Sequence, residues 1–175
     1  MSGDADAQLR RLLDEEATAQ AARARERSRW LRQQASEERT FAGLLAACRE
    51  VGARVQIHTV AGIRHDGVLQ AVGPDWCQLD GSWRTYVALS GIVALHAPVV
   101  AAADNESPSQ APRLSELLTE LAPERPQVRL QLVDATVDGT LVAGGLDVLS
   151  VQPPGGAPAT YVPLAAVVAI SVRPL

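Results

Sequence analysis

The segment GVLQAVGPDWCQLD at residues 67–80 recurs later in the chain as GTLVAGGLDVLSVQ at residues 139–152. The identical positions are Gly67 and Gly139, Leu69 and Leu141, Ala71 and Ala143, Gly73 and Gly145, and Asp75 and Asp147. These identities fall at every second residue, which is the period of side chains on one face of a β-strand. The sequence therefore predicts a duplicated unit that is rich in strands.

The similarity continues on both sides of this block and keeps its order along the chain. RTFAGLLAACREVGARVQI (39–57) aligns with PRLSELLTELAPERPQVRL (112–130), and YVALSGIVALHA (86–97) aligns with YVPLAAVVAISV (161–172). The first pair carries the i, i+3, i+4, i+7 apolar spacing of a short amphipathic helix in both copies. The second copy also inserts three residues in the turn PPGGAP. Each copy is predicted to be a short helix followed by five short strands.

Turn residues between the apolar runs set the expected bounds of these elements. In the first copy we expect a helix at 41–50, capped by Thr40 and ending before Gly52, and strands at 54–60, 64–72, 75–80, 84–89 and 92–96. In the second copy we expect a helix at 113–121 and strands at 127–133, 136–144, 147–152, 159–164 and 167–172.

The fold class predicted from this pattern is α+β and mainly β. We expect two tandem units, each a short helix plus a small five-stranded barrel, behind a charged N-terminal helix. The expected domains are the N-terminal helix at 1–39, a first barrel at 40–97, a linker at 98–112 and a second barrel at 113–175. The linker is polar, contains proline and has no hydrophobic period.

Composition and charge narrow the class of protein further. The chain has 175 residues, 47% of them hydrophobic, and a formal net charge of -4, so no global basic field attracts nucleic acid. Its first residues are acidic and polar where a signal peptide is basic and then apolar, and no run is long enough to span a membrane. We expect a cytoplasmic protein. Cys48 and Cys77 lack the CxxC spacing of a metal site, and buried free thiols are expected.

The pattern of glycines and apolar residues resembles the Sm-like fold of the Sm, LSm and Hfq proteins. Gly62, Gly67 and Leu69 match the first signature of that family, and the bend falls at Gly73 with an acid two residues later at Asp75. In the second signature Leu89, Gly91, Ile92 and Leu95 match, but Ser90 replaces a basic residue. The resemblance covers 40–97 and, more weakly, 113–172. The resemblance implies an Sm-like fold, and RNA binding is the function expected from it.

Two departures affect the functional part of this resemblance. Sm proteins use a polar residue after the bend and a basic residue in the second signature to hold RNA, whereas this chain has Trp76-Cys77-Gln78 and Leu89-Ser90-Gly91 there. We therefore carry over the fold but not the RNA pocket. The whole chain also resembles short proteins of high-GC bacteria that sometimes bear a Fis-type regulator label, although no helix-turn-helix pattern supports that label.

The strongest candidate binding segment is AARARERSRWLRQQ at residues 21–34, with five arginines and a single acid. On a helix its arginines form two stripes, and Trp30 lies within one of them. Such a surface can grip phosphates and stack a base. The alternative is a solvated helix held by local ion pairs, because the N-terminal region as a whole is electrically balanced. The predicted nucleic-acid-binding residues are Arg23, Arg25, Arg27, Arg29, Trp30 and Arg32.

The sequence patterns around the remaining polar residues indicate structural roles. His58, His65 and His96 stand alone in strand patterns without metal-ligand spacing, so no metal site is predicted. The duplicated Asp66 and Asp138 precede the repeated glycine and are interpreted as turn residues. No nucleophile elbow, phosphate-binding loop, dinucleotide fingerprint or zinc-protease motif is present. We therefore expect a protein that is not an enzyme and has no cofactor.

The function predicted from the sequence is that of a bacterial Sm-like regulatory protein that binds single-stranded RNA in post-transcriptional regulation. The first alternative is a protein-interaction adaptor that uses exposed barrel edges and the N-terminal helix. The second is a DNA-binding transcriptional regulator. No membrane partner is expected. Because one barrel edge can be paired inside a fused chain, we expect a self-contained barrel pair or a low-order homo-oligomer.

Overall fold

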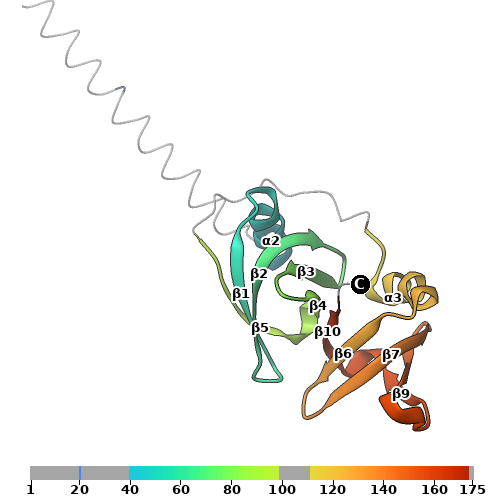
Figure 1. The fold of residues 1–175 in the computed structure, drawn as a ribbon. Helices are drawn as coiled ribbons and strands as arrows, with labels where there is room; N and C mark the ends of the chain where they lie inside the picture. Colours follow the sequence, from blue (N-terminus) through green and yellow to red (C-terminus); the bar gives the residue numbers. More distant parts are fainter. Residues whose placement is uncertain (1–19, 21–39, 99–110, 174–175) are drawn as a thin grey trace, which may run out of the picture. The chain divides into compact units, whose positions relative to one another are not determined.

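The computed structural model describes residues 20, 40–98 and 111–173. Residues 40–98, the first repeat, and 111–173, the second repeat, are each a short helix followed by five strands (Figure 1). The strands of both repeats form one antiparallel, ten-stranded open sheet, so the fold is α+β and mainly β. In the part of the chain described, neither helix is long and apolar enough to cross a membrane.

The first repeat begins with helix α2 (Phe41–Glu50). As predicted, Thr40 caps this helix, and its hydroxyl accepts a hydrogen bond of 3.0 Å from the Gly43 amide. The helix ends before Gly52, whose φ of 60° is left-handed and suits glycine. The strands are β1 (Arg54–Thr59), β2 (Arg64–Val72), β3 (Trp76–Asp80), β4 (Arg84–Ala88) and β5 (Ile92–His96).

The second repeat follows the same plan, beginning with helix α3 (Leu114–Leu121). Its strands are β6 (Gln127–Leu132), β7 (Thr136–Gly144), β8 (Val148–Gln152), β9 (Thr160–Pro163) and β10 (Val167–Val172). The strand order is β5-β1-β2-β3-β4 in the first repeat and β10-β6-β7-β8-β9 in the second. Equivalent strands therefore occupy equivalent places, as the duplication predicts, and all expected bounds are met to within one residue.

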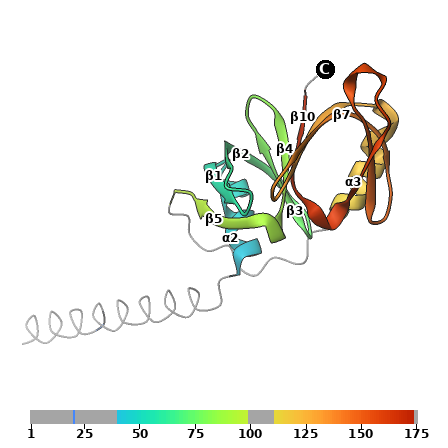
Figure 2. The ribbon, with the colours of Figure 1, turned by 90° about the horizontal axis from the view of Figure 1, so that it is seen from below.

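The two repeats form one continuous sheet because β4 of the first pairs with β10 of the second, an internal edge pairing of the kind expected for a fused chain. Val87, Tyr86 and Thr85 lie opposite Ala169, Ile170 and Ser171 in an antiparallel ladder. Figure 2 shows these two strands side by side between the repeats. An unpaired strand edge exposes a row of amide and carbonyl groups, and this pairing satisfies one such edge from each repeat.

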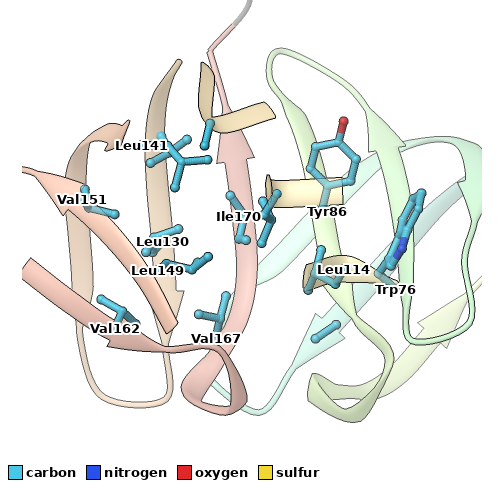
Figure 3. Close-up of a cluster of buried hydrophobic side chains, with 14 residues drawn as sticks. Trp76, Tyr86, Leu114, Leu130, Leu141, Leu149, Val151, Val162, Val167 and Ile170 are labelled. Atoms are coloured by element: carbon cyan, nitrogen blue, oxygen red, sulfur yellow. The ribbon is translucent and has the colours of Figure 1, made fainter. Parts of the chain in front are cut away.

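The hydrophobic cores also cross the boundary between the repeats. Trp76, Tyr86 and Ala88 belong to strands of the first repeat, yet they pack in the core of the second. Figure 3 shows Trp76 and Tyr86 beside Leu114 and Ile170. In the opposite direction, Ala169 of β10 packs in the core of the first repeat. Because each repeat completes the other's core, we infer that the two repeats are stable as one unit.

Candidate nucleic-acid interface

A groove of about 410 Å³ opens where the two repeats meet. It lies beside the β4–β10 ladder, which brings the start of β2 and the β3–β4 turn next to β6. Most of its lining side chains are polar or charged, and one is aromatic. The polar, charged and aromatic lining residues include Arg64, His65, Trp83, Thr85, Arg129, Gln131 and Ser171.

Two hydrogen bonds between side chains that line the groove join the repeats. His65 Nε2 lies 2.9 Å from Gln131 Oε1, so the imidazole N–H donates to the side-chain carbonyl. The hydroxyls of Thr85 and Ser171, both buried, are 3.0 Å apart. Buried polar groups cost free energy unless they are hydrogen-bonded, and the members of both pairs are hydrogen-bonded to each other. The groove is therefore a preformed polar surface rather than a packing defect.

Trp83 and the arginines give the groove its aromatic and charged character. The guanidinium carbon of Arg129 lies 5.6 Å from the centroid of the half-buried Trp83 ring, within cation–π range. Arg129 also donates to Asp138, with 2.7 Å between Nε and Oδ1, and Asp138 raises the pKa of Arg129. Arg64 Nε is 3.6 Å from Asp66 Oδ2. Because each arginine has a carboxylate partner, the groove carries little net positive charge.

Burial shifts the pKa of His65, which lines the groove. Burial lowers the pKa of His65 from its ordinary value of 6.5, while the bond to Gln131 and the nearby Asp66 carboxylate oppose that shift. A histidine whose pKa is lower in the folded state binds fewer protons in the folded state than in the unfolded state. Its contribution to the free energy of unfolding is therefore fully present above pH 6.5 and is lost as the pH falls.

We expect the free energy of unfolding to fall between about pH 7.5 and about pH 5.5 in the wild type, because the unfolded chain takes up a proton on His65 near the ordinary pKa of 6.5, whereas burial lowers the pKa of His65 in the folded chain. His65→Gln, which keeps a polar group but does not titrate, should make this decrease smaller. Urea denaturation at the two pH values measures both slopes. Equal slopes in the two proteins would contradict the account.

The arginine-rich segment predicted from the sequence lies outside the residues that the structure describes. This applies to Arg23, Arg25, Arg27, Arg29, Trp30 and Arg32, which remain a sequence prediction. Sequence reasoning did not find the groove itself. Its residues come from β2, β3, the β3–β4 turn, β4, β6 and β10, and the pairing of β4 with β10 brings those of the two repeats together.

The acidic residues take roles that differ from the turns expected of them. Asp66 and Asp138 lie inside β2 and β7, where they pair with Arg64 and Arg129, so their interpretation as turn residues was wrong. Asp75 does lie at the bend before β3, but its Oδ1 also accepts a hydrogen bond of 2.9 Å from the Leu114 amide. It therefore caps the first turn of α3, a long-range role that the sequence did not reveal.

The thiols and histidines show no metal-binding arrangement in the described ranges 40–98 and 111–173. Cys48 and Cys77 are buried and free, as predicted, and burial raises the pKa of Cys77 to about 12. His58 and His96 were expected to stand alone, but their rings lie 4.9 Å apart between centroids. No group of three or more potential metal ligands is found among these residues.

Comparison of the sequence with protein-family models and with curated proteins found no match.

Proposed function

We propose that this chain is a non-enzymatic Sm-like protein with two tandem barrels that binds single-stranded RNA and acts in post-transcriptional regulation. The observation that carries the proposal is the junction groove, where Trp83 lies beside Arg129 and the lining also includes Gln131 and His65. Single-stranded nucleic acid is bound by aromatic rings that stack with bases and by polar side chains that read base edges. The groove offers both kinds of group on one surface.

The sequence supplies the charge that the groove lacks. Residues 21–34 carry five arginines and one acid, whereas Arg64 and Arg129 in the groove are paired with carboxylates. Contacts to phosphates supply most of the nonspecific affinity for nucleic acid, while base contacts supply selectivity. We assign phosphate contacts to residues 21–34 and base contacts to the groove.

Fluorescence anisotropy with a labelled single-stranded RNA tests both assignments. Five engaged arginines predict a log-log salt slope of roughly -3 to -4, at about 0.7 per contact. Replacing Arg25, Arg29 and Arg32 with Ser should reduce the slope by about 2. Trp83→Ala should weaken binding by about 1 to 3 kcal/mol without changing the slope, because stacking releases no counterions.

Trp30→Ala is the matched comparison for Trp83→Ala. An equal or larger loss with Trp30→Ala would move the stacking site from the groove to residues 21–34. Thermal unfolding of the Trp83 variant shows whether it is still folded. If the wild type binds no single strand at about 50 mM salt, where electrostatic contacts are strong, the RNA proposal is wrong.

A protein-interaction adaptor is the second candidate, favoured by the two open edges of the sheet. β5 and β9 are its end strands, and among the described residues no strand pairs with the outer side of either. Exposed edges can accept a further strand through backbone hydrogen bonds. This candidate predicts binding of a strand-forming partner and no salt-sensitive binding of RNA.

A further inference from the structure

A row of polar side chains crosses the outward face of the first repeat and ends at the junction groove. His58 and His96 have ring centroids 4.9 Å apart, and His58 Nε2 lies 3.0 Å from Gln56 Oε1. Gln56 Nε2 in turn donates a hydrogen bond of 2.7 Å to Asp66 Oδ1. Asp66 Oδ2 lies 3.6 Å from Arg64 Nε, and both of these residues line the groove. The polar surface of the groove therefore continues as far as His96 on β5.

The pairing of three neighbouring strands places these side chains on one face. Strands β5, β1 and β2 lie side by side at one end of the sheet (Figure 1). Gln56 of β1 lies opposite Asp66 of β2 and His96 of β5, and directly opposite residues project to the same face. Ile57, the next residue along β1, is buried in the core of the first repeat, so Gln56 projects outward. His58 is two residues from Gln56 and shares its face.

The same face of the second repeat forms one side of the junction groove. The counterparts of Gln56, His58 and His96 in the repeat are Arg129, Gln131 and Ser171, and all three line the groove. In the first repeat the face is more open, because His96 is exposed and Gln56 and His58 are half-buried. The chain therefore has this polar face twice, once in the wall of the groove and once beside it.

The two imidazole rings offer a surface on which a base can stack. RNA-binding proteins stack unpaired bases on aromatic rings, histidine included. The two ring planes are tilted by 48°, and the hydrogen bond with Gln56 restrains the orientation of the His58 ring. The His96 side chain is exposed, so a base can reach it from solvent. The pair is therefore suited to holding one base of a single strand.

Arg64 connects the groove to the histidine pair. It lines the groove and also lies opposite His58 in the β1–β2 ladder. Neighbouring strands are about 4.8 Å apart, so β2 and β5 are separated by about 10 Å, a distance that a few nucleotides span. Because Arg64 is paired with Asp66, this face carries little net charge. We therefore expect it to contribute stacking rather than electrostatic attraction.

We propose that single-stranded RNA bound in the junction groove continues over β2 and β1 and stacks a second base on the His58–His96 pair, the histidine subsite. This inference rests on the proposed RNA binding and adds a path to it, from Trp83 in the groove across Arg64 to His96. The occupant is the same strand because the two positions share Arg64 and Asp66 and form one continuous polar surface.

Fluorescence anisotropy of the full chain with labelled oligouridines of two lengths tests the path. A strand of about 2 nucleotides fills the groove only, whereas a strand of about 8 nucleotides reaches both positions. His96→Ala should weaken binding of the long strand about 5- to 100-fold, as the loss of one stacked base does, and leave the short strand unchanged. Trp83→Ala should weaken both. The salt dependence should stay the same, because stacking releases no counterions.

Two further variants separate stacking from other causes. His96→Phe keeps an aromatic ring and should restore most of the affinity for the long strand. Tyr161→Ala removes a ring that is 72% exposed on β9, at the opposite end of the sheet, and should leave both strands unaffected. Both positions are exposed, so neither change disturbs a core.

Three results would overturn the path. If Trp83→Ala weakens both strands while His96→Ala weakens neither, RNA binds in the groove but does not reach the histidine subsite. Equal losses from His96→Ala and Tyr161→Ala would mean that exposed rings act without a defined path. If the wild type binds neither strand, the proposed function is wrong and the histidine subsite is wrong with it.

Discussion

Ala169→Glu is expected to lower the free energy of unfolding by roughly 4 kcal/mol or more, the largest effect of any single change considered for this protein. Ala169 is fully buried in β10 and packs in the core of the first repeat, opposite Val87 of β4. A carboxylate there has no solvent and no cationic partner among the residues of that core. Since a domain is stable by only about 5–15 kcal/mol, this loss is a large fraction of the stability.

Ala94→Glu is the matched control, because Ala94 is the counterpart of Ala169 on the exposed edge strand β5. Its effect should stay within about 0.5 kcal/mol, as is usual for surface substitutions. Both changes are measured by urea denaturation of the full chain. Similar losses for the two variants would mean that β10 is not buried between the repeats.

Trp76→Ala is expected to lower the free energy of unfolding by about 3 to 5 kcal/mol, the usual cost of truncating a buried Trp. Trp76 belongs to β3 of the first repeat but packs edge-on against Tyr86, with 5.6 Å between ring centroids, in the core of the second (Figure 3). Its indole N–H also donates a hydrogen bond of 2.9 Å to the Pro112 carbonyl. The change therefore removes packing and leaves that carbonyl unpaired.

Trp76→Phe separates the two contributions, because it keeps an aromatic ring but removes the indole donor. Its loss should be smaller than that of Trp76→Ala and include about 1 kcal/mol for the missing hydrogen bond. Leu146→Ala, at a residue that is 89% exposed, should have almost no effect. Urea denaturation gives all three values. A Trp76→Ala effect as small as that of Leu146→Ala would contradict the conclusion that Trp76 of the first repeat packs in the core of the second.

The local structure of this chain was predictable from sequence because local signals and the repeat agree. The i, i+3, i+4, i+7 apolar spacing located both helices, Thr40 located the start of α2, and turn residues located all ten strands to within one residue. The two copies support the same assignment of elements, because the same apolar pattern occurs in both. Agreement between independent local signals is what makes such predictions reliable.

The junction and the groove were not predictable from the same signals. Which edge strands pair depends on packing between segments distant in the chain, and Tyr86 and Tyr161 carry the same local pattern although only Tyr86 is buried. The hydrogen bond between His65 and Gln131 likewise joins residues that no local spacing relates. The only sequence sign of the difference was Trp76, a large aromatic residue where the second copy has Val148.

Hydrogen exchange of the full chain, with and without saturating single-stranded RNA, is the most direct test of the proposed function. If bases bind in the junction groove, exchange should slow at the amides of residues 81–83 in the β3–β4 turn and residues 129–131 in β6. Protection at residues 21–34 alone, or no change anywhere, would contradict the assignment of the groove as the RNA interface.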